Sequence, residues 1–311
     1  MSNAKFITAE DVMGAWEDNV LTGEPPTLYP IAEGGPLSKV EVGPKQIALF
    51  GGAPGAGKTA FVMQSTVDAL RLSPQLRAVV CNIEMPPEVL LDRQLARLSG
   101  VPLDAIRYRE LEESHGQRID TGLSTIKAIA NRLCFVRPPF DLENVAATAD
   151  AFIPNDETDL LLVLDYIQRI APPGGHGTKR GSIDASMSYL REFADAGAAV
   201  VVVSSVGRQK DNRGRSSYAG ENLNLASFKE SGELEFGADD AYILAPAAGG
   251  GCLRTLKHLK ARHTKPTDVE LRFHASTQRF VAVDPLEGDA TSLLGEPQET
   301  CEETAGATWI P

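Results

Sequence analysis

A glycine-rich segment between an apolar run and a helical stretch constrains this chain more than any other feature. Residues 52–59 read GAPGAGKT, which fits the pattern GxxxxGK[ST]. The apolar run 47–50 precedes the segment, and helical spacing over 59–70 follows it. A glycine turn that only caps a helix would give no reason for Lys-Thr at its end. The segment therefore predicts a phosphate-binding loop between a strand and a helix.

Each position of this loop has an expected role. Glycines let successive backbone N–H groups turn toward a phosphate at a helix N-terminus. Lys58 is expected to neutralise the β- and γ-phosphates, and the Thr59 hydroxyl is expected to bind Mg²⁺. The predicted nucleotide-binding positions are Gly52, Ala53, Pro54, Gly55, Ala56, Gly57, Lys58, Thr59 and Ala60. The loop thus predicts a site for a nucleoside triphosphate with Mg²⁺ as the cofactor.

Apolar runs and helical stretches alternate along the middle of the chain. Runs typical of strands buried on both faces occur at 47–50, 78–83, 160–164 and 199–203. Helical spacing between them favours right-handed crossovers and occurs at 87–98, 142–152 and 183–195. Later runs predict a terminal strand with antiparallel additions, at 241–244, 253–260, 269–273 and 280–283. The predicted fold is one α/β domain over residues 40–283, a mostly parallel twisted sheet flanked by helices.

The two ends of the chain differ from this core in charge. The 42 acidic and 30 basic residues give a formal net charge of -12, so the surface as a whole repels nucleic acid and anionic membranes. Residues 284–311 hold seven acidic residues without Lys or Arg, and we expect a disordered tail there, with a docking peptide ending in Trp309 as the alternative. Residues 1–39 are acidic and rich in Pro and Gly, which predicts an N-terminal arm and linker. The core is near neutral, so a polyanion must be bound locally.

Composition also excludes several classes of protein. The four cysteines are far apart without a CxxC pair, which argues against a disulfide framework or a zinc site. No apolar run approaches the roughly 18 residues of a membrane helix, and the N-terminus is acidic where a signal peptide would be basic. His258 and His263 are expected at the surface without a chemical role. These features predict a cytoplasmic protein that does not contact membranes.

Two carboxylates follow strand-like runs. Asp165 ends the run 160–164 and would emerge at the carboxyl edge of the sheet, where it suits a Mg²⁺ site. Glu84 ends the run 79–83 at the same edge and could orient or deprotonate a water that attacks the γ-phosphate. The alternative for Asp165 is an acid that only ends a strand. The alternative for Glu84 is an exposed acid that only begins the next helix.

Basic residues gather at positions expected in loops after two strands. They are Lys179, Arg180, Arg208, Lys210, Arg213 and Arg215. Such segments at one sheet edge suit the phosphate backbone of a single-stranded nucleic acid, and solvated surface loops are the alternative. Lys260 and Arg262 alternate along a strand-like segment, so their side chains point the same way. They could act on a nucleotide of a neighbouring subunit, or they could be plain surface cations.

Several segments, in order, are similar to one known family. They are 57–61 (GKTAF), 82–86 (NIEMP), 164–168 (LDYIQ), 229–232 (KESG) with Glu235 and 238–239 (AD), and 260–262 (KAR) before Pro266. Together they resemble the ATPase domain of DnaB-type replicative helicases, within the RecA-like group of P-loop NTPases.

The resemblance implies roles for particular residues. It implies a catalytic glutamate at Glu84, a Walker B aspartate at Asp165, and a pair at Lys260 and Arg262 that acts in trans on the adjacent subunit. It also implies a ring, expected to be a hexamer, whose channel loops hold single-stranded DNA.

Two departures from the family pattern bear on function. Ser205 stands where such helicases usually carry a glutamine that senses the γ-phosphate. Only some 39 residues precede the core, where such helicases have a helical domain that binds primase. This favours a stand-alone helicase of a plasmid, phage or mobile element, for which replication or plasmid and phage proteins are candidate partners, or a derived ATPase that no longer unwinds. The leading hypothesis is an ATP-dependent DNA helicase or translocase. The alternatives are a nucleotide-switched assembly or regulatory ATPase without unwinding activity, and a loader or recombinase-like ATPase that forms filaments.

Overall fold

A nine-stranded sheet organises the computed structural model. The structure describes residues 7–154, 158–174, 179–207, 209–210, 216–217, 223–228, 232–247 and 251–283. The strand order is β11-β10-β9-β8-β1-β5-β4-β2-β3. The strands are β1 (Ile47–Gly52), β2 (Arg77–Asn82), β3 (Leu133–Phe135), β4 (Leu160–Asp165), β5 (Ala199–Ser205), β8 (Asp240–Pro246), β9 (Leu253–Ala261), β10 (Val269–His274) and β11 (Arg279–Ala282). A separate pair joins β6 (Gln209–Lys210) to β7 (Ser216–Ser217).

The strands fall into a parallel and an antiparallel group. The six strands from β8 to β3 in the sheet order run parallel to one another. The last three strands of the chain add to the edge at β8, each antiparallel to its neighbour. This arrangement confirms the predicted mostly parallel sheet with C-terminal antiparallel strands.

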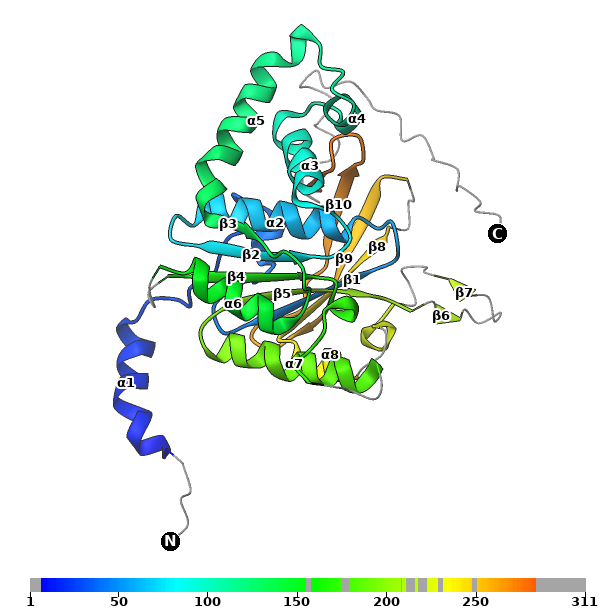
Figure 1. The fold of residues 1–311 in the computed structure, drawn as a ribbon. Coiled ribbons are helices and arrows are strands. Elements are labelled where there is room, and N and C mark those ends of the chain that lie inside the picture. The colour runs from blue at the N-terminus through cyan, green and yellow to red at the C-terminus, as the bar shows by residue number, and fades with distance from the viewer. Residues whose placement is uncertain are drawn as a thin grey trace.

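Helices cover both faces of the sheet (Figure 1). The described α-helices are α1 (Ala9–Thr22), α2 (Lys58–Leu72), α3 (Pro87–Ser99), α4 (Leu103–Arg107), α5 (Gly116–Ile129), α6 (Leu142–Phe152), α7 (Lys179–Asp195) and α8 (Gly232–Gly237). In Figure 1, α2, α3 and α5 lie above the sheet, and α6, α7 and α8 lie below it. No described helix is both long and apolar enough to cross a bilayer.

Strand β1 shows why its apolar run is continuous. Ala48 and Phe50 belong to the core cluster that includes α2, whereas Ile47 and Leu49 belong to the cluster that includes α6 and α7. Successive strand side chains point to opposite faces, and both faces are covered, so no polar alternation remains. β1 is thus a central strand of the sheet, and the glycine loop follows its carboxyl end.

The N-terminal segment consists of a projecting helix and a packed linker. None of the residues of α1 is buried, and the helix stands away from the domain (Figure 1). In contrast, Tyr29, Ile31 and Leu37 are buried within the cluster that contains Phe50. The linker thus contributes apolar side chains to the core, which its Pro- and Gly-rich composition did not indicate. The boundary predicted at residue 39 stays a prediction, and the predicted tail at 284–311 lies outside the described residues.

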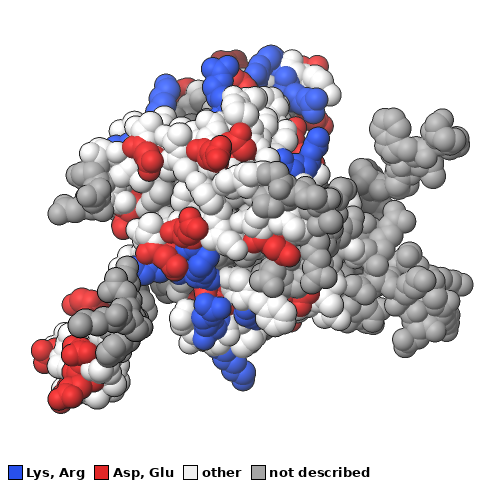
Figure 2. Space-filling model, turned by 60° about the horizontal axis from the view of Figure 1, so that its bottom comes forward, with Lys and Arg blue, Asp and Glu red and all other residues white. Residues whose placement is uncertain are grey.

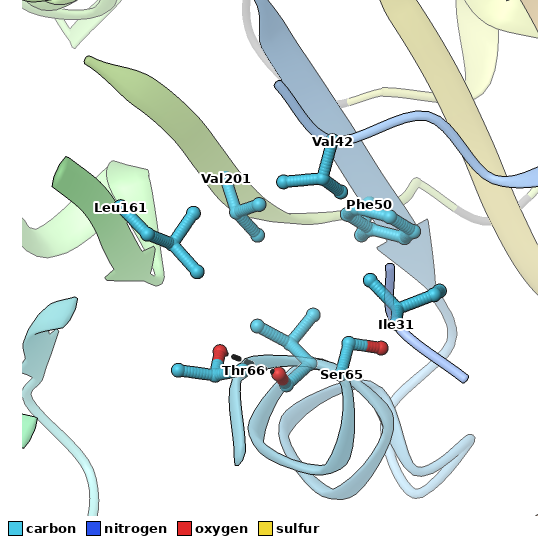
Figure 3. A pocket seen from close by; sticks show the side chains of 8 residues that line it. Ile31, Val42, Phe50, Ser65, Thr66, Leu161 and Val201 are labelled. Atoms are coloured by element: carbon cyan, nitrogen blue, oxygen red, sulfur yellow. Dashed lines mark hydrogen bonds between the residues drawn. The ribbon is translucent and has the colours of Figure 1, made fainter. Parts of the chain in front are cut away.

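A small apolar cavity lies where this linker meets α2 and the sheet. Figure 3 shows Ile31 of the linker and Val42 of the segment before β1 facing Ser65 and Thr66 of α2, with Val201 of the sheet beside them. Its volume is about 10 Å³, which is about the room of one water molecule. The cavity is therefore a packing gap rather than a nucleotide site.

Charged side chains are mixed over the described surface. In the view of Figure 2, Lys and Arg form small groups among acidic side chains, and acidic side chains gather on the projecting helix at the lower left. This distribution agrees with an acidic chain that can bind a polyanion only locally.

Candidate active site

The glycine loop joins β1 to α2 at the carboxyl edge of the sheet, as predicted. Gly55 and Gly57 have φ values of 76° and 95°, which favour glycine. A Cβ at Gly57 would lie 2.7 Å from the ring of Phe280 on β11, whereas a Cβ at Gly55 would meet no atom within 4 Å. Gly57 therefore lets the loop pack closely on the sheet. The open side at Gly55 leaves room for a ligand beside the backbone.

Lys58 begins α2 with its side chain folded over the loop. Its Nζ donates to the carbonyl oxygens of Gly52 at 2.9 Å and Ala53 at 3.0 Å. Burial lowers the pKa of Lys58, and the charges of Asp165 and Glu84 act in the opposite direction. The ammonium thus lies inside the loop with two carboxylates in electrostatic range, where a phosphate could replace the carbonyl partners.

Thr59 and Asp165 meet across the site. The Thr59 hydroxyl donates to Asp165 Oδ2 at 2.6 Å, and the amide of Asn82 donates to the same oxygen at 2.8 Å. Asp165 is only 5% exposed. Burial raises the pKa of Asp165, and the hydrogen bond from Thr59 opposes this effect.

These oxygens have the chemistry of a Mg²⁺ site that phosphate oxygens and water would complete. A hydroxyl and one carboxylate are the hard ligands that Mg²⁺ prefers. Elsewhere in the part of the chain that the structure describes, no group of three or more His, Cys, Asp or Glu could hold a metal ion. The predicted metal residues therefore fit a nucleotide-bound Mg²⁺ rather than a site made of protein ligands alone.

Asn82 connects the two carboxylates of the site. Its Oδ1 accepts from the backbone N–H groups of Glu84 at 3.1 Å and Met85 at 2.8 Å, while its Nδ2 donates to Asp165. Glu84 itself is exposed at the start of the turn before α3. One buried amide thus fixes the backbone under Glu84 relative to Asp165. Asn82 was not predicted as a site residue, although a polar residue ending an apolar run was a signal for it.

Lys260 uses its donors within its own chain. Its Nζ donates to the carbonyl oxygens of Glu235 at 2.7 Å, Phe236 at 3.0 Å and Ala238 at 2.7 Å. A Lys near the last carbonyls of a helix often binds them in this way. Burial lowers the pKa of Lys260, and the charge of Arg262 adds to this effect. These contacts do not support the expectation that Lys260 reaches a neighbouring nucleotide.

Arg262 is the more exposed cation of the pair. Its guanidinium contacts Asp239 Oδ1 at 2.6 Å, and 47% of its side chain is exposed. Asp239 is buried, and its other oxygen accepts from the backbone N–H of Ile47 at 2.8 Å and from Arg191 at 3.0 Å. Lys260 and Arg262 point toward the same turn, as their spacing predicted.

This turn lies at the opposite edge of the sheet from the phosphate loop. Asp240 begins β8 beside Ala48, near the start of β1, whereas the loop follows Gly52 at its end. A strand of six residues spans about 20 Å at roughly 3.3 Å per residue. Arg262 therefore lies too far from the phosphate loop of its own chain to contact a nucleotide there.

His258, expected at the surface, is buried beneath this edge. Its Nε2 lies 2.9 Å from Asp240 Oδ1, its Nδ1 accepts from the backbone N–H of Thr267 at 3.2 Å, and its ring stacks on Tyr242. The expectation was wrong because β9 pairs with β8 here and buries the His258 side chain. The identity of one polar residue in the sequence does not indicate which strand lies beside it. His258 fixes the segment that follows Arg262.

The model of one known protein family matches most of this chain. The model described as "DnaB-like helicase C terminal domain" matches residues 41–282. The chain belongs to this family. The resemblance stated from the motifs is thereby confirmed, and the DnaB-like domain covers nearly the whole described core.

Curated relatives of this DnaB-like domain are distant in sequence. A probable plasmid replicative DNA helicase of Chlamydia trachomatis serovar L2 is 21% identical over 236 residues, covering 76% of this chain and 50% of the relative. The replicative DNA helicase DnaB of Pasteurella multocida is 27% identical over 204 residues, covering 63% of this chain and 41% of the relative. The chain spans half or less of the length of these relatives.

Solved structures show the same fold. One solved ATPase domain superposes with a TM-score of 0.75 at 16% identity, covering 90% of this chain and 100% of that one. A DnaB-like replicative helicase, solved in a study of its interactions with primase, superposes with a TM-score of 0.75 at 17% identity, covering 90% of this chain and 68% of that one. These likenesses confirm the RecA-like fold of the DnaB-like domain.

The basic residues predicted to contact DNA are only partly described. Lys179 and Arg180 begin α7, so the expected loop position was wrong. The first turn of α7 is polar, and the apolar spacing that predicted this helix begins only at Ile183. Lys210 lies in β6. Arg208, Arg213 and Arg215 lie outside the described residues, so nucleic-acid binding by this set stays a prediction.

Replacing Asn82 with Ala is expected to lower the ATPase kcat of the DnaB-like domain about 10- to 100-fold, the usual effect of removing a residue that orients metal ligands. The substitution removes the donor to Asp165 and the acceptor for the N–H groups of Glu84 and Met85. Steady-state hydrolysis over a Mg²⁺ titration measures the effect. Asn82→Asp keeps the shape but loses the donor, and it should be impaired at least as much. An Asn82→Ala variant with wild-type kcat would contradict the connecting role.

Proposed function

We propose that this protein is a Mg²⁺-dependent ATPase that assembles as a ring and moves along single-stranded DNA, as an ATP-dependent helicase or translocase. The observation that carries the proposal is the convergence of Lys58, Thr59, Asp165 and Glu84 at one carboxyl edge of the sheet, joined by the hydrogen bonds of Asn82. Such a set can bind a nucleoside triphosphate and also hold a water near its γ-phosphate. The relatives named as replicative DNA helicases support DNA as the polymer along which the protein moves.

The residues of this edge divide the chemistry between them. Glu84 orients a water for in-line attack on the γ-phosphate and accepts its proton. Lys58 moves from the carbonyls of Gly52 and Ala53 to the β- and γ-phosphates, which offsets charge in the transition state. Thr59 and Asp165 would hold Mg²⁺, which would supply positive charge beside the phosphates.

Arg262 supports a ring as the functional assembly. Because it lies at the sheet edge opposite to its own phosphate loop, its guanidinium can serve only the site of a neighbouring subunit. A closed arrangement repeats this contact for every subunit, and we propose a hexamer. Lys260 holds the α8–β8 turn from which Arg262 extends.

The projecting helix α1 offers an apolar face to such a neighbour. Val12, Met13, Trp16 and Val20 are each more than 40% exposed, and the helical spacing puts Asp11 and Asp18 on the opposite face. An exposed apolar face of this kind is typical of a site that another protein surface buries in an assembly. We propose a second copy of the chain as the occupant, since the contact then repeats around the ring together with that of Arg262.

Steady-state ATP hydrolysis with and without single-stranded DNA, at two salt concentrations, tests the proposed function. DNA is expected to stimulate hydrolysis, and the stimulation is expected to fall as salt rises, because salt weakens contacts with phosphates. Hydrolysis that DNA does not change would favour the regulatory ATPase, a candidate supported by the short Ser205 side chain. An absence of hydrolysis would contradict both candidates.

A further inference from the structure

Gln168 makes a hydrogen-bonded bridge between two strand ends. It lies in a single 3-10 turn (Ile167–Arg169) that follows β4. Its Nε2 donates to the Ser204 hydroxyl at 2.7 Å, and its Oε1 accepts from the backbone N–H of Ser205 at 3.3 Å. Both partners end β5, so one side-chain amide joins the segment after β4 to the last two residues of the neighbouring strand.

This bridge lies next to two parts of the candidate nucleotide site. In the sheet, Ser205 lies beside Gly52, the first residue of the phosphate loop, and Asp165 lies beside Val203. Gln168 follows Asp165 by three residues. A change in the position of Asp165 therefore has a direct route through Gln168 to the end of β5.

The end of β5 leads toward the basic segment. Val206 pairs with Phe228, and the N–H of Gly207 donates to the carbonyl of Ser227 at 2.7 Å. The next residue in the chain is Arg208, the first of the four cations predicted to contact DNA at 208–215. The backbone that Gln168 holds is thus continuous with that segment.

The short side chain of Ser205 gives Gln168 its importance. The Ser205 side chain is short, and the contact with the segment after β4 is made by the longer Gln168 side chain, whose Oε1 accepts from the Ser205 N–H. Ser204 completes the contact with a buried hydroxyl. The connection between the two strand ends is made from β4 rather than from β5.

We infer that Gln168 couples the nucleotide site to the segment after β5, so that bound ATP changes the affinity for single-stranded DNA and bound DNA changes the rate of hydrolysis. This inference rests on the proposed function. Gln168 acts as a positioning residue, since it holds Ser204 and Ser205 from a turn that begins two residues after Asp165. Thermodynamic linkage requires the effect on binding to be reciprocal.

Gln168→Leu tests the coupling, because it keeps most of the side-chain volume and removes both hydrogen bonds. The stimulation of hydrolysis by oligo(dT) is expected to fall about fivefold or more, in the range of ordinary coupling between sites. The rate without DNA is expected to change little, because Gln168 touches none of the groups assigned to hydrolysis. The affinity for fluorescent oligo(dT), compared with a non-hydrolysable ATP analogue and with ADP, is expected to lose its dependence on the nucleotide.

Ser204→Ala is the matched second variant, since it removes only the hydroxyl that Gln168 contacts. It is expected to lower the stimulation in the same direction, and the double variant should be no worse than Gln168→Leu alone, because both changes break one contact. Thermal unfolding of each variant shows whether the fold is kept; if Gln168→Leu does not fold, Ser204→Ala carries the test.

The failure of the inference differs from the failure of the proposed function. Full stimulation and full nucleotide dependence of DNA affinity in both variants, with a stimulated wild type, would overturn the role of Gln168 alone. A wild-type enzyme that hydrolyses ATP without any response to DNA would overturn the proposed DNA motor and the coupling together.

Discussion

Glu84→Gln is expected to abolish ATP turnover while the protein still binds ATP. The substitution keeps the shape of the side chain and the backbone that Asn82 holds, but it removes the group that accepts the proton of the attacking water. General bases contribute about 10²- to 10⁴-fold to the rate, so the loss should reach that range. Single-turnover hydrolysis and equilibrium binding of a fluorescent ATP analogue separate the two effects.

Lys58→Ala provides the contrast for this prediction. It removes the ammonium that lies over the phosphate loop, so nucleotide affinity and turnover should both fall. Glu84→Gln should instead bind ATP with nearly wild-type affinity. A Glu84→Gln variant that turns over ATP at the wild-type rate would remove Glu84 as the base, and a parallel loss of binding would indicate a structural role.

Arg262→Ala is expected to reduce turnover about 10³-fold or more, the usual contribution of an arginine finger. The chain should still fold, because the side chain is half exposed and Asp239 keeps its contacts with Arg191 and the N–H of Ile47. Lys265→Ala, at an exposed cation three residues further on, is the matched control and should keep wild-type activity. The measurement is steady-state hydrolysis at a protein concentration at which the assembly is intact.

Mixing two inactive variants shows whether Arg262 acts between subunits. Glu84→Gln subunits have an intact Arg262, and Arg262→Ala subunits have an intact phosphate loop and base. Co-assembled subunits should therefore regain part of the activity at interfaces where an intact Arg262 faces an intact site. A mixture as inactive as its components, in assemblies that contain both, would contradict action in trans.

The sequence predicted which candidate side chains lie together at one edge of the sheet, because folding and the proposed chemistry constrain the same positions there. Lys58 and Thr59 follow a glycine pattern that few structures accommodate, and Glu84 and Asp165 each end an apolar run. Parallel strands bring their carboxyl ends to one edge. The position of a residue along its strand was therefore enough to place these side chains together.

Contacts between distant segments could not be predicted in this way. Asn82 meets Asp165 across 83 residues of sequence, and Gln168 meets Ser204 across 36. Periodicity reports which face of a strand is buried, but it does not report which strand lies beside it. The strand order, with β1 between β8 and β5, had to come from the structure.

Charged residues were the least predictable group. Lys260 has the appearance of a free cation in the sequence, yet it binds three carbonyls around α8, a helix of six residues without a clear apolar period. Long side chains can satisfy neighbours on several elements, so their spacing alone does not show whether they are available to a partner.

Strand β1 connects the turn that carries Arg262 to the phosphate loop. Its first residue, Ile47, is bonded to the aspartate that holds Arg262, and its last residue, Gly52, begins the phosphate loop. In the proposed ring, the two ends of this strand belong to successive catalytic centres. The strand is short and buried, and it is hydrogen-bonded to parallel strands on both sides. It therefore fixes the distance between neighbouring catalytic centres in the proposed ring, so that hydrolysis passes from one centre to the next over a constant separation.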